Sequence, residues 1–101
     1  MPAVTRIGDK DVKHCTPMTR QGGSSDVFAN GIGISRQGDN NTVHNGPGHT
    51  PSHPSCTPHA APIAKGSSTV FVNGKGCGRV GDAISGCTAV AQGSPNVFAG
   101  G

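Results

Sequence analysis

A nine-residue pattern occurs three times in this chain, and its copies align without a gap. It reads Gly-Ser-x-x-Val-Phe-x, followed twice by Asn-Gly and once by Gly-Gly, and it occupies residues 23–31, 66–74 and 93–101. Val and Phe favour strands, while Asn-Gly favours a two-residue hairpin turn. Each copy therefore predicts a turn, a short strand and a second turn. We expect the Val-Phe pairs to form the core: Val27 and Phe28, Val70 and Phe71, Val97 and Phe98.

A second pattern, Arg-x-Gly-Asp, also occurs three times, at residues 6–9, 36–39 and 79–82. The intervals between successive copies are unequal, which counts against a solenoid of fixed period and favours three lobes closed around an axis. We therefore expect a small, mainly β cone that forms a single domain over residues 1–101, with internal pseudo-threefold symmetry. Its units span about residues 6–31, 36–74 and 79–101. The Asp residues are expected to cap turns or to pair with the Arg of a neighbouring unit.

Composition limits both the core and the function. Only 32% of the 101 residues are hydrophobic, and there are 17 Gly and 8 Pro, so we expect a metal, disulfides or a partner to support the fold. The net charge of +3 comes without a basic run, and Tyr and Trp are absent, which counts against nucleic-acid binding. All acidic residues are Asp, and they are few, which counts against a paired-carboxylate active site.

Targeting signals are also absent from the sequence. No stretch approaches about 20 apolar residues, so no membrane span is expected. Residues 1–6 lack the apolar segment of a secretory signal peptide. We therefore expect synthesis in the cytoplasm, with delivery by other machinery if the protein acts outside the cell.

Three metal-ligand residue types occupy the same position in the three units. His14, His44 and Cys87 each follow their unit's Arg at the same offset, and unit lengths diverge only beyond them, most of all in the long loop 45–63. Three such ligands around an axis leave one tetrahedral position, for which His59 is our choice. His49, His53 and Cys56 are the alternatives. A filled His3Cys set predicts a closed structural zinc site at the loop-bearing end.

The remaining cysteines leave other interpretations open. Cys15 and Cys56 are candidates for a disulfide near the long loop, and Cys77 is expected to be a small buried residue. Two alternative functions follow. One is a small metal-dependent hydrolase that uses His14, His44 and a loop His. The other is a disulfide-stabilised secreted adhesin or toxin-like protein.

The combined unit, Gly-Ser-x-x-Val-Phe-x-Asn-Gly, four residues, then Arg-x-Gly-Asp, resembles the PAAR-repeat family over residues 6–101. The namesake Pro-Ala-Ala-Arg is Gly33-Ile34-Ser35-Arg36 in one copy and Gly76-Cys77-Gly78-Arg79 in the next, so only the Arg is kept. The resemblance implies a pointed cone with a metal near its vertex, typically zinc, with iron as the other candidate. The matching ligand positions are His14, His44, His59 and Cys87.

The resemblance also implies a function and a partner. Proteins of this family sharpen the spike tips of type VI secretion systems and of contractile-tailed phages, where they help to pierce a membrane. The broad base is expected to sit on a trimeric β-helical spike of the VgrG type, with one copy per trimer. Membrane contact is expected to be transient, with no nucleic acid and no small-molecule substrate. Because the repeats fill the chain, we expect no effector domain and no enzyme activity.

Overall fold

Short strands, turns and loops make up the whole described part of the chain. The computed structural model describes residues 1–13, 16–47 and 56–101. The strands are β1 (Phe28–Ala29), β2 (Ile32–Gly33), β3 (His44–Pro47), β4 (Cys56–His59), β5 (Phe71–Val72) and β6 (Lys75–Gly76). They pair antiparallel as β1–β2, β3–β4 and β5–β6. The described residues contain no helix that could cross a membrane.

Two of the hairpins turn at the Asn-Gly pairs, as the sequence predicts. Asn30 and Gly31 connect β1 to β2 with φ angles of 56° and 74°, and Asn73 and Gly74 connect β5 to β6 with 54° and 76°. Two successive residues with positive φ define the turn that best matches the twist of paired strands. Asn tolerates this left-handed conformation better than most residues, and Gly adopts it without strain.

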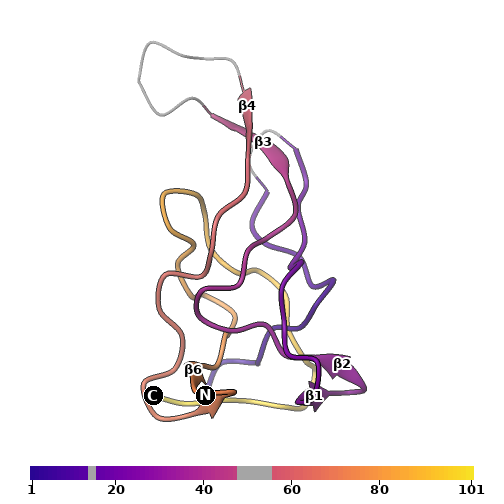
Figure 1. Cartoon of the computed structure of the whole chain (residues 1–101), viewed down its shortest axis with the longest axis vertical. Coiled ribbons are helices and arrows are strands. Elements are labelled where there is room, and N and C mark those ends of the chain that lie inside the picture. Colours follow the sequence, from indigo (N-terminus) through magenta and orange to yellow (C-terminus); the bar gives the residue numbers. More distant parts are fainter. Residues whose placement is uncertain (14–15, 48–55) are drawn as a thin grey trace.

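A third, matching unit is built from the two ends of the chain. Val4 donates its N–H to the Val97 carbonyl (3.0 Å) and accepts from the Ser94 N–H (2.8 Å). Ile34 makes the same pair of hydrogen bonds with Val27 and Ser24, at 3.1 and 2.8 Å. Both termini accordingly lie at the end of the molecule that carries β1, β2 and β6 (Figure 1). The N-terminal segment, which lies outside the expected unit 79–101, thus bonds to residues near the C-terminus.

The three units meet in a closed triangle of backbone hydrogen bonds. Thr5 donates to the Gly78 carbonyl (3.0 Å), Gly78 to Ser35 (2.9 Å), and Ser35 back to Thr5 (3.0 Å). Each of these residues directly precedes the Arg of an Arg-x-Gly-Asp pattern. A Cβ atom on Gly78 would lie 2.6 Å from the Ser35 carbonyl oxygen, so the triangle leaves room only for glycine there.

Above the triangle, six short segments form a closed ring. Each segment is bridged to a neighbour on both sides, so the ring has no open edge of the kind that promotes aggregation. The bridges are Lys10↔Thr19, Arg20↔Asn41, Asn40↔Pro62, Ile63↔Ile84, Ala83↔Ala89 and Asp11↔Val90.

Two apolar clusters fill the interior. The lower cluster comprises Val4, Ala29, Ile34, Val72, Cys77 and Ala99, and the upper one comprises Ala61, Ile63, Ile84 and Val90. Burial of Cys77 was predicted and is confirmed, since it is 1% exposed.

The prediction that the phenylalanines form the core is wrong. Phe28, Phe71 and Phe98 are 56%, 60% and 50% exposed. Successive side chains of a strand point to opposite faces, and here the residue after each Phe points inward: Ala29, Val72 or Ala99. Val27 and Val70 are exposed as well, and of the three valines only Val97 packs against the core.

Part of the ring interior is polar. The Arg20 guanidinium forms an ion pair with Asp11 at 3.0 Å, and neither side chain has any exposed surface. Arg20 also donates to the Ser35 hydroxyl (3.2 Å) and to the Asp39 carbonyl. The Asn41 side-chain amide also donates to Asp11, at Oδ2, over 3.2 Å. A buried charge is tolerated only when it is paired and hydrogen-bonded in this way.

Each Arg-x-Gly-Asp pattern forms a turn that its own Asp caps. In one copy, Asp39 Oδ2 accepts from both the Arg36 backbone N–H and the Arg36 Nε, each at 2.8 Å. The same contacts join Arg6 to Asp9 and Arg79 to Asp82. The capping role is therefore confirmed, whereas pairing with a neighbouring unit's Arg is wrong. The turn brings residues i and i+3 together, so the nearest guanidinium is the one in the same motif.

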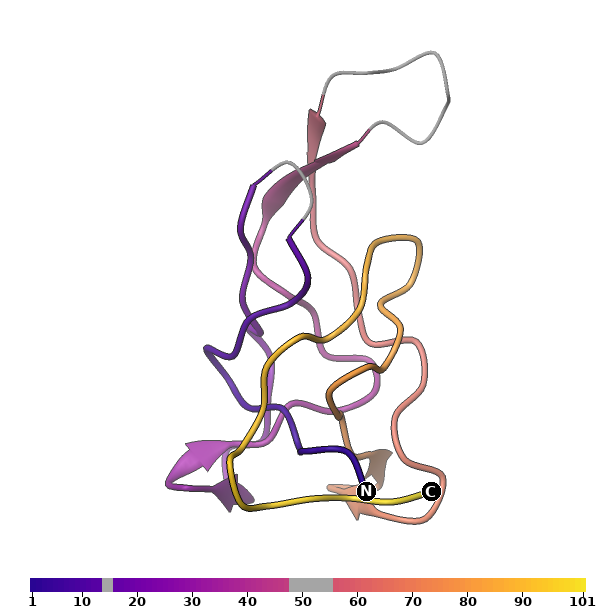
Figure 2. The ribbon, with the colours of Figure 1, turned by 180° about the vertical axis from the view of Figure 1, so that it is seen from behind.

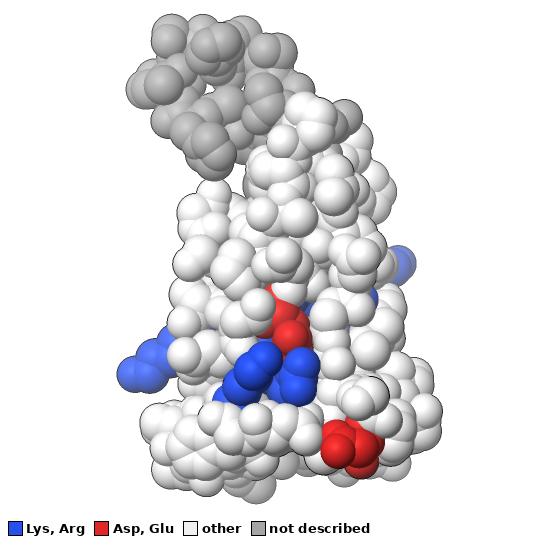
Figure 3. All heavy atoms as spheres, viewed as in Figure 1, with Lys and Arg blue, Asp and Glu red and all other residues white. Residues whose placement is uncertain are grey.

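The molecule is elongated, with principal extents of 40 × 23 × 20 Å. The β3–β4 hairpin lies at the opposite end from β1, β2, β6 and the termini, in both views (Figures 1 and 2). We call the end with the termini the base. Charged side chains are sparse on the face shown in Figure 3, where a group of acidic atoms near the centre adjoins a group of basic atoms.

Candidate metal centre

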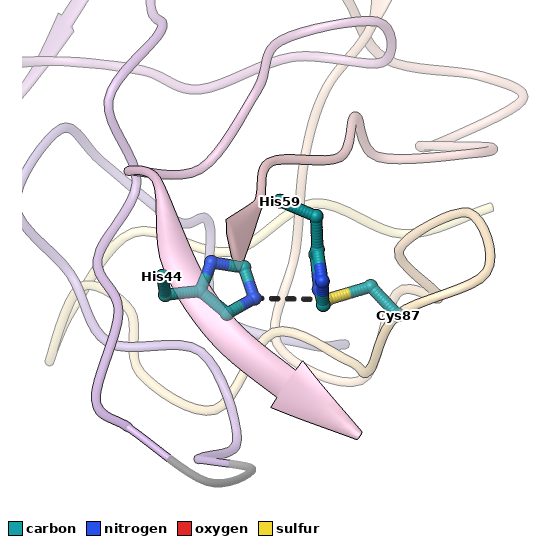
Figure 4. A group of neighbouring side chains, drawn as sticks. All are labelled: His44, His59 and Cys87. Carbon is teal, nitrogen blue, oxygen red and sulfur yellow. Dashed lines mark hydrogen bonds between the residues drawn. The ribbon is translucent and has the colours of Figure 1, made fainter. Parts of the chain in front are cut away.

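The β3–β4 hairpin brings two histidines together. His44 opens β3 and His59 closes β4, and the strand register pairs them directly. Directly paired residues of antiparallel strands project their side chains from the same face. The two imidazole rings accordingly lie edge to face, with centroids 4.3 Å apart and planes at 72° (Figure 4).

A tight turn of the third unit supplies the third side chain. Cys87 donates its backbone N–H to the Ile84 carbonyl (3.0 Å), and Gly86 within this turn has a φ of 60°. The Cys87 Sγ lies 3.3 Å from His44 Nε2 and 3.3 Å from His59 Nε2 (Figure 4). The three candidate ligand atoms all lie within 4.8 Å of one another.

The hydrogen bonding of His44 prepares its ring to bind a cation. His44 Nδ1 lies 2.7 Å from the Thr42 carbonyl oxygen. A carbonyl oxygen only accepts, so Nδ1 carries the proton and Nε2 presents its lone pair toward Cys87. Metal-bound histidines commonly use the same arrangement, in which a backbone carbonyl fixes the tautomer and the ring orientation.

The donor set and its spacing fit a tetrahedral metal ion. Zn–N bonds of about 2.05 Å and Zn–S bonds of about 2.3 Å place nitrogen and sulfur about 3.5 Å apart in a tetrahedral site, close to the 3.3 Å found here. A metal cation can accept lone pairs from both nitrogens and from the sulfur at the same time. Burial raises the pKa of the Cys87 thiol, and the Asn41 amide opposes that shift.

The sequence-predicted ligands are placed as follows. His44, His59 and Cys87 come together as a group that could hold a metal ion. His14 lies outside the described residues, as do the alternative ligands His49 and His53. The proposed disulfide between Cys15 and Cys56 also lies outside them, because Cys15 is not described and only the backbone of Cys56 is.

One neighbour of the cluster was missed by the sequence analysis. Asn41 Nδ2 lies 3.9 Å from the Cys87 Sγ and 3.2 Å from Asp11 Oδ2. Its position in the second unit corresponds to Asp11 in the first and Ile84 in the third, since each follows its unit's Arg at the same offset. The sequence did carry a signal for Asn41, because this polar residue occupies a repeat position that holds the apolar Ile84 in the third unit.

The fold and the cluster together define a small all-β scaffold with a histidine–cysteine group that could hold a metal ion, away from the end that carries its termini. Comparison with protein families gives the class a name. The family model of the PAAR motif matches residues 48–101, more than half of the chain. The chain therefore belongs to the PAAR-motif family, whose members are structural spike-tip proteins of type VI secretion and phage systems. A search of curated proteins found no match.

Proposed function

We propose that this protein is the structural tip of a contractile injection machine, and that it caps and sharpens a trimeric β-helical spike. Family membership supports a place on such a spike, in a type VI secretion system or a phage tail. In this proposal the chain is one domain of three lobes around an axis, it helps the spike to pierce a membrane, and it acts by shape and not by catalysis.

The observation that carries this proposal is the composition of the base. Phe28, Phe71 and Phe98 occupy the same position of the three units, and all are at least half exposed. Phe28 lies on β1, Phe71 on β5, and Phe98 is bridged to Ala3. Exposed aromatic side chains are the typical anchors of protein interfaces. Three equivalent anchors suit a partner that ends in three equivalent chains.

At the other end, we propose a closed structural zinc site formed by His14, His44, His59 and Cys87. When bound, the ion would join the β3–β4 hairpin to the Cys87 turn. Such a link contributes folding free energy that a small core lacks. A fully protein-ligated site also leaves no open coordination position for substrate water.

The docking proposal is tested by mixing the protein with the trimeric spike of the same source and weighing the complex by native mass spectrometry. One copy per trimer is expected. The triple variant Phe28→Ser, Phe71→Ser, Phe98→Ser is expected to lose at least about 100-fold in affinity, because hot-spot residues each contribute about 2 kcal/mol or more. Val12→Ser, at a 49% exposed site outside the strands of the base, is the control. Full binding by the triple variant would contradict the proposal.

The metal proposal is tested by elemental analysis of the purified protein, with one zinc per chain expected. Cys87→Ser is expected to lower both zinc content and thermal stability, whereas the hydrolase alternative predicts an intact fold and a hydrolytic activity. His14→Ala is expected to lose zinc as His59→Ala does. Retention of tightly bound zinc by His14→Ala would remove His14 from the ligand set.

A further inference from the structure

Asn41 joins the candidate metal cluster to the polar interior of the ring. It is fully buried, at 0% exposed, and it belongs to a ring segment in which Asn41 is bridged to Arg20 and Asn40 to Pro62. Because Asn41 is fully buried, no solvent competes for its hydrogen bonds. What its amide does is decided entirely by the protein groups around it.

The orientation of this amide follows from a single contact. Asn41 Oδ1 accepts the backbone N–H of Ala61 at 2.9 Å. A backbone N–H only donates, so this end of the amide is the oxygen and the other end is the NH2 group. The NH2 group has two hydrogens, and it has two acceptors: Asp11 Oδ2 at 3.2 Å and the Cys87 sulfur at 3.9 Å.

The equivalent residues of the other two units cannot make this contact. Asp11 offers only acceptor oxygens when ionised, and Ile84 offers no polar atom. Of the three equivalent residues, Asn41 is therefore the one that can donate a hydrogen bond to the Cys87 sulfur. Asp11 is in turn held by Arg20 at 3.0 Å, so a continuous path of hydrogen bonds runs from the sulfur into the ring.

We propose that Asn41 is a positioning residue of the metal centre, whose N–H holds the Cys87 sulfur toward the two imidazoles and couples it to the Asp11–Arg20 pair. The inference rests on the metal site proposed above. It adds an outer hydrogen bond to sulfur, of the kind that orients ligands and tunes metal centres. A role confined to the core would satisfy Ala61 and Asp11 but would leave the metal–sulfur bond unaffected.

Cobalt(II) distinguishes these two roles, because a cobalt–thiolate bond gives a charge-transfer absorption band that reports on the sulfur. Asn41→Leu is expected to lower cobalt affinity about 10–100-fold and to move the band to longer wavelength, since the sulfur loses an N–H that withdraws electron density. Ser35→Ala is the matched control. It removes an Arg20 hydrogen bond from the same network but does not touch the sulfur, so its band is expected at the wild-type wavelength.

A second variant tests the same donor with a side chain of similar size. Asn41→Asp is close in size and keeps the acceptor for Ala61, but it lacks both donors. It is expected to show the same band shift. In a Cys87→His background, Asn41→Leu is expected to change cobalt affinity by no more than about twofold, because the sulfur is already gone.

The possible failures are distinct. A wild-type protein that shows no cobalt–thiolate band overturns the metal site and this inference together. A wild-type band that neither Asn41→Leu nor Asn41→Asp shifts overturns the inference alone. The same holds if Asn41→Leu weakens cobalt binding equally with and without Cys87.

Discussion

Replacing Arg20 by Leu tests how the buried ion pair supports the ring. The side chain of Arg20 is bonded to Asp11, to Ser35 and to the Asp39 carbonyl, without exposure to solvent. Its removal leaves a buried carboxylate without a counter-charge. Breaking a buried pair in this way costs about 3–5 kcal/mol, against a total stability of about 5–15 kcal/mol for a typical domain.

The repeat supplies the compensating change. Arg20 corresponds to Ile63 and Val90 in the other units, and Asp11 corresponds to Ile84. An apolar pair at these positions is therefore compatible with the fold. The double variant Asp11→Leu, Arg20→Leu is expected to recover at least about 2 kcal/mol relative to Arg20→Leu, because apolar replacement of a whole buried pair is often neutral.

The pH dependence of the single variant has a definite sign. Burial already raises the pKa of Asp11, and Arg20 is the strongest influence that opposes this shift. Without Arg20, the pKa of Asp11 in the folded state rises further above its unfolded value of about 3.9. The folded state of the variant then holds the proton more tightly than the unfolded state does. Its free energy of unfolding is therefore highest at low pH and falls as pH rises through the folded-state pKa of Asp11. The loss relative to wild type is thus smallest near the unfolded-state pKa and grows as pH rises toward the folded-state pKa.

Urea unfolding followed by circular dichroism, at a fixed saturating zinc concentration, gives these free energies of unfolding. Two results would refute the reasoning. One is a loss of less than about 1 kcal/mol in Arg20→Leu, within the range of a single neutral hydrogen bond. The other is a double variant that is no more stable than the single one.

Three further predictions concern the metal and the backbone. Zinc affinity is expected to rise about tenfold per pH unit from pH 7 toward the thiol pKa, since burial raises the pKa of Cys87 and zinc must displace that proton. Calorimetry in two buffers measures the proton that is released on zinc binding. The Cys87→His variant should not release this proton. His59→Ala is expected to lower zinc affinity at least about tenfold in a chelator competition assay, with Lys65→Ala unchanged as the control. Gly38→Ala is expected to lower the free energy of unfolding by about 1–2 kcal/mol. The φ of Gly38 is 88° and an added Cβ would meet no atom within 4 Å, so the cost is backbone strain alone. An unchanged melting temperature would contradict this.

The closeness of His44 and Cys87 was predictable because equivalent positions of repeated units converge near a shared axis. His44 and Cys87 hold the same offset from their unit's Arg, and the structure brings them within 3.3 Å. His59 is our choice from a loop with several candidate ligands, and the strand register pairs it with His44. The ligand set as a whole stays a prediction, and His14 lies outside the described residues.

Other features could not be predicted from one-dimensional patterns. Val-Phe was assigned to the core from hydrophobicity, but a two-residue strand has no alternation from which to tell inward from outward positions. The pairing of residues 1–5 with residues 94–99 joins segments from opposite ends of the chain, and nothing in either segment specifies the other. The Arg20–Asp11 pair depends likewise on which ring positions face inward.

The pairing of the two chain ends has a topological consequence. Val4 and Ile34 make matching hydrogen bonds, so Pro2 corresponds to Ile32. In the aligned repeats, Gly101 corresponds to Gly31. Gly31 and Ile32 are consecutive in the first unit. The backbone is thus close to a nicked circle, and the nick lies at a hairpin turn. Joining Gly101 to Pro2 and reopening the chain between Asn73 and Gly74 should give a circular permutant with the same fold. A passenger domain fused to either end would leave from the same corner of the base.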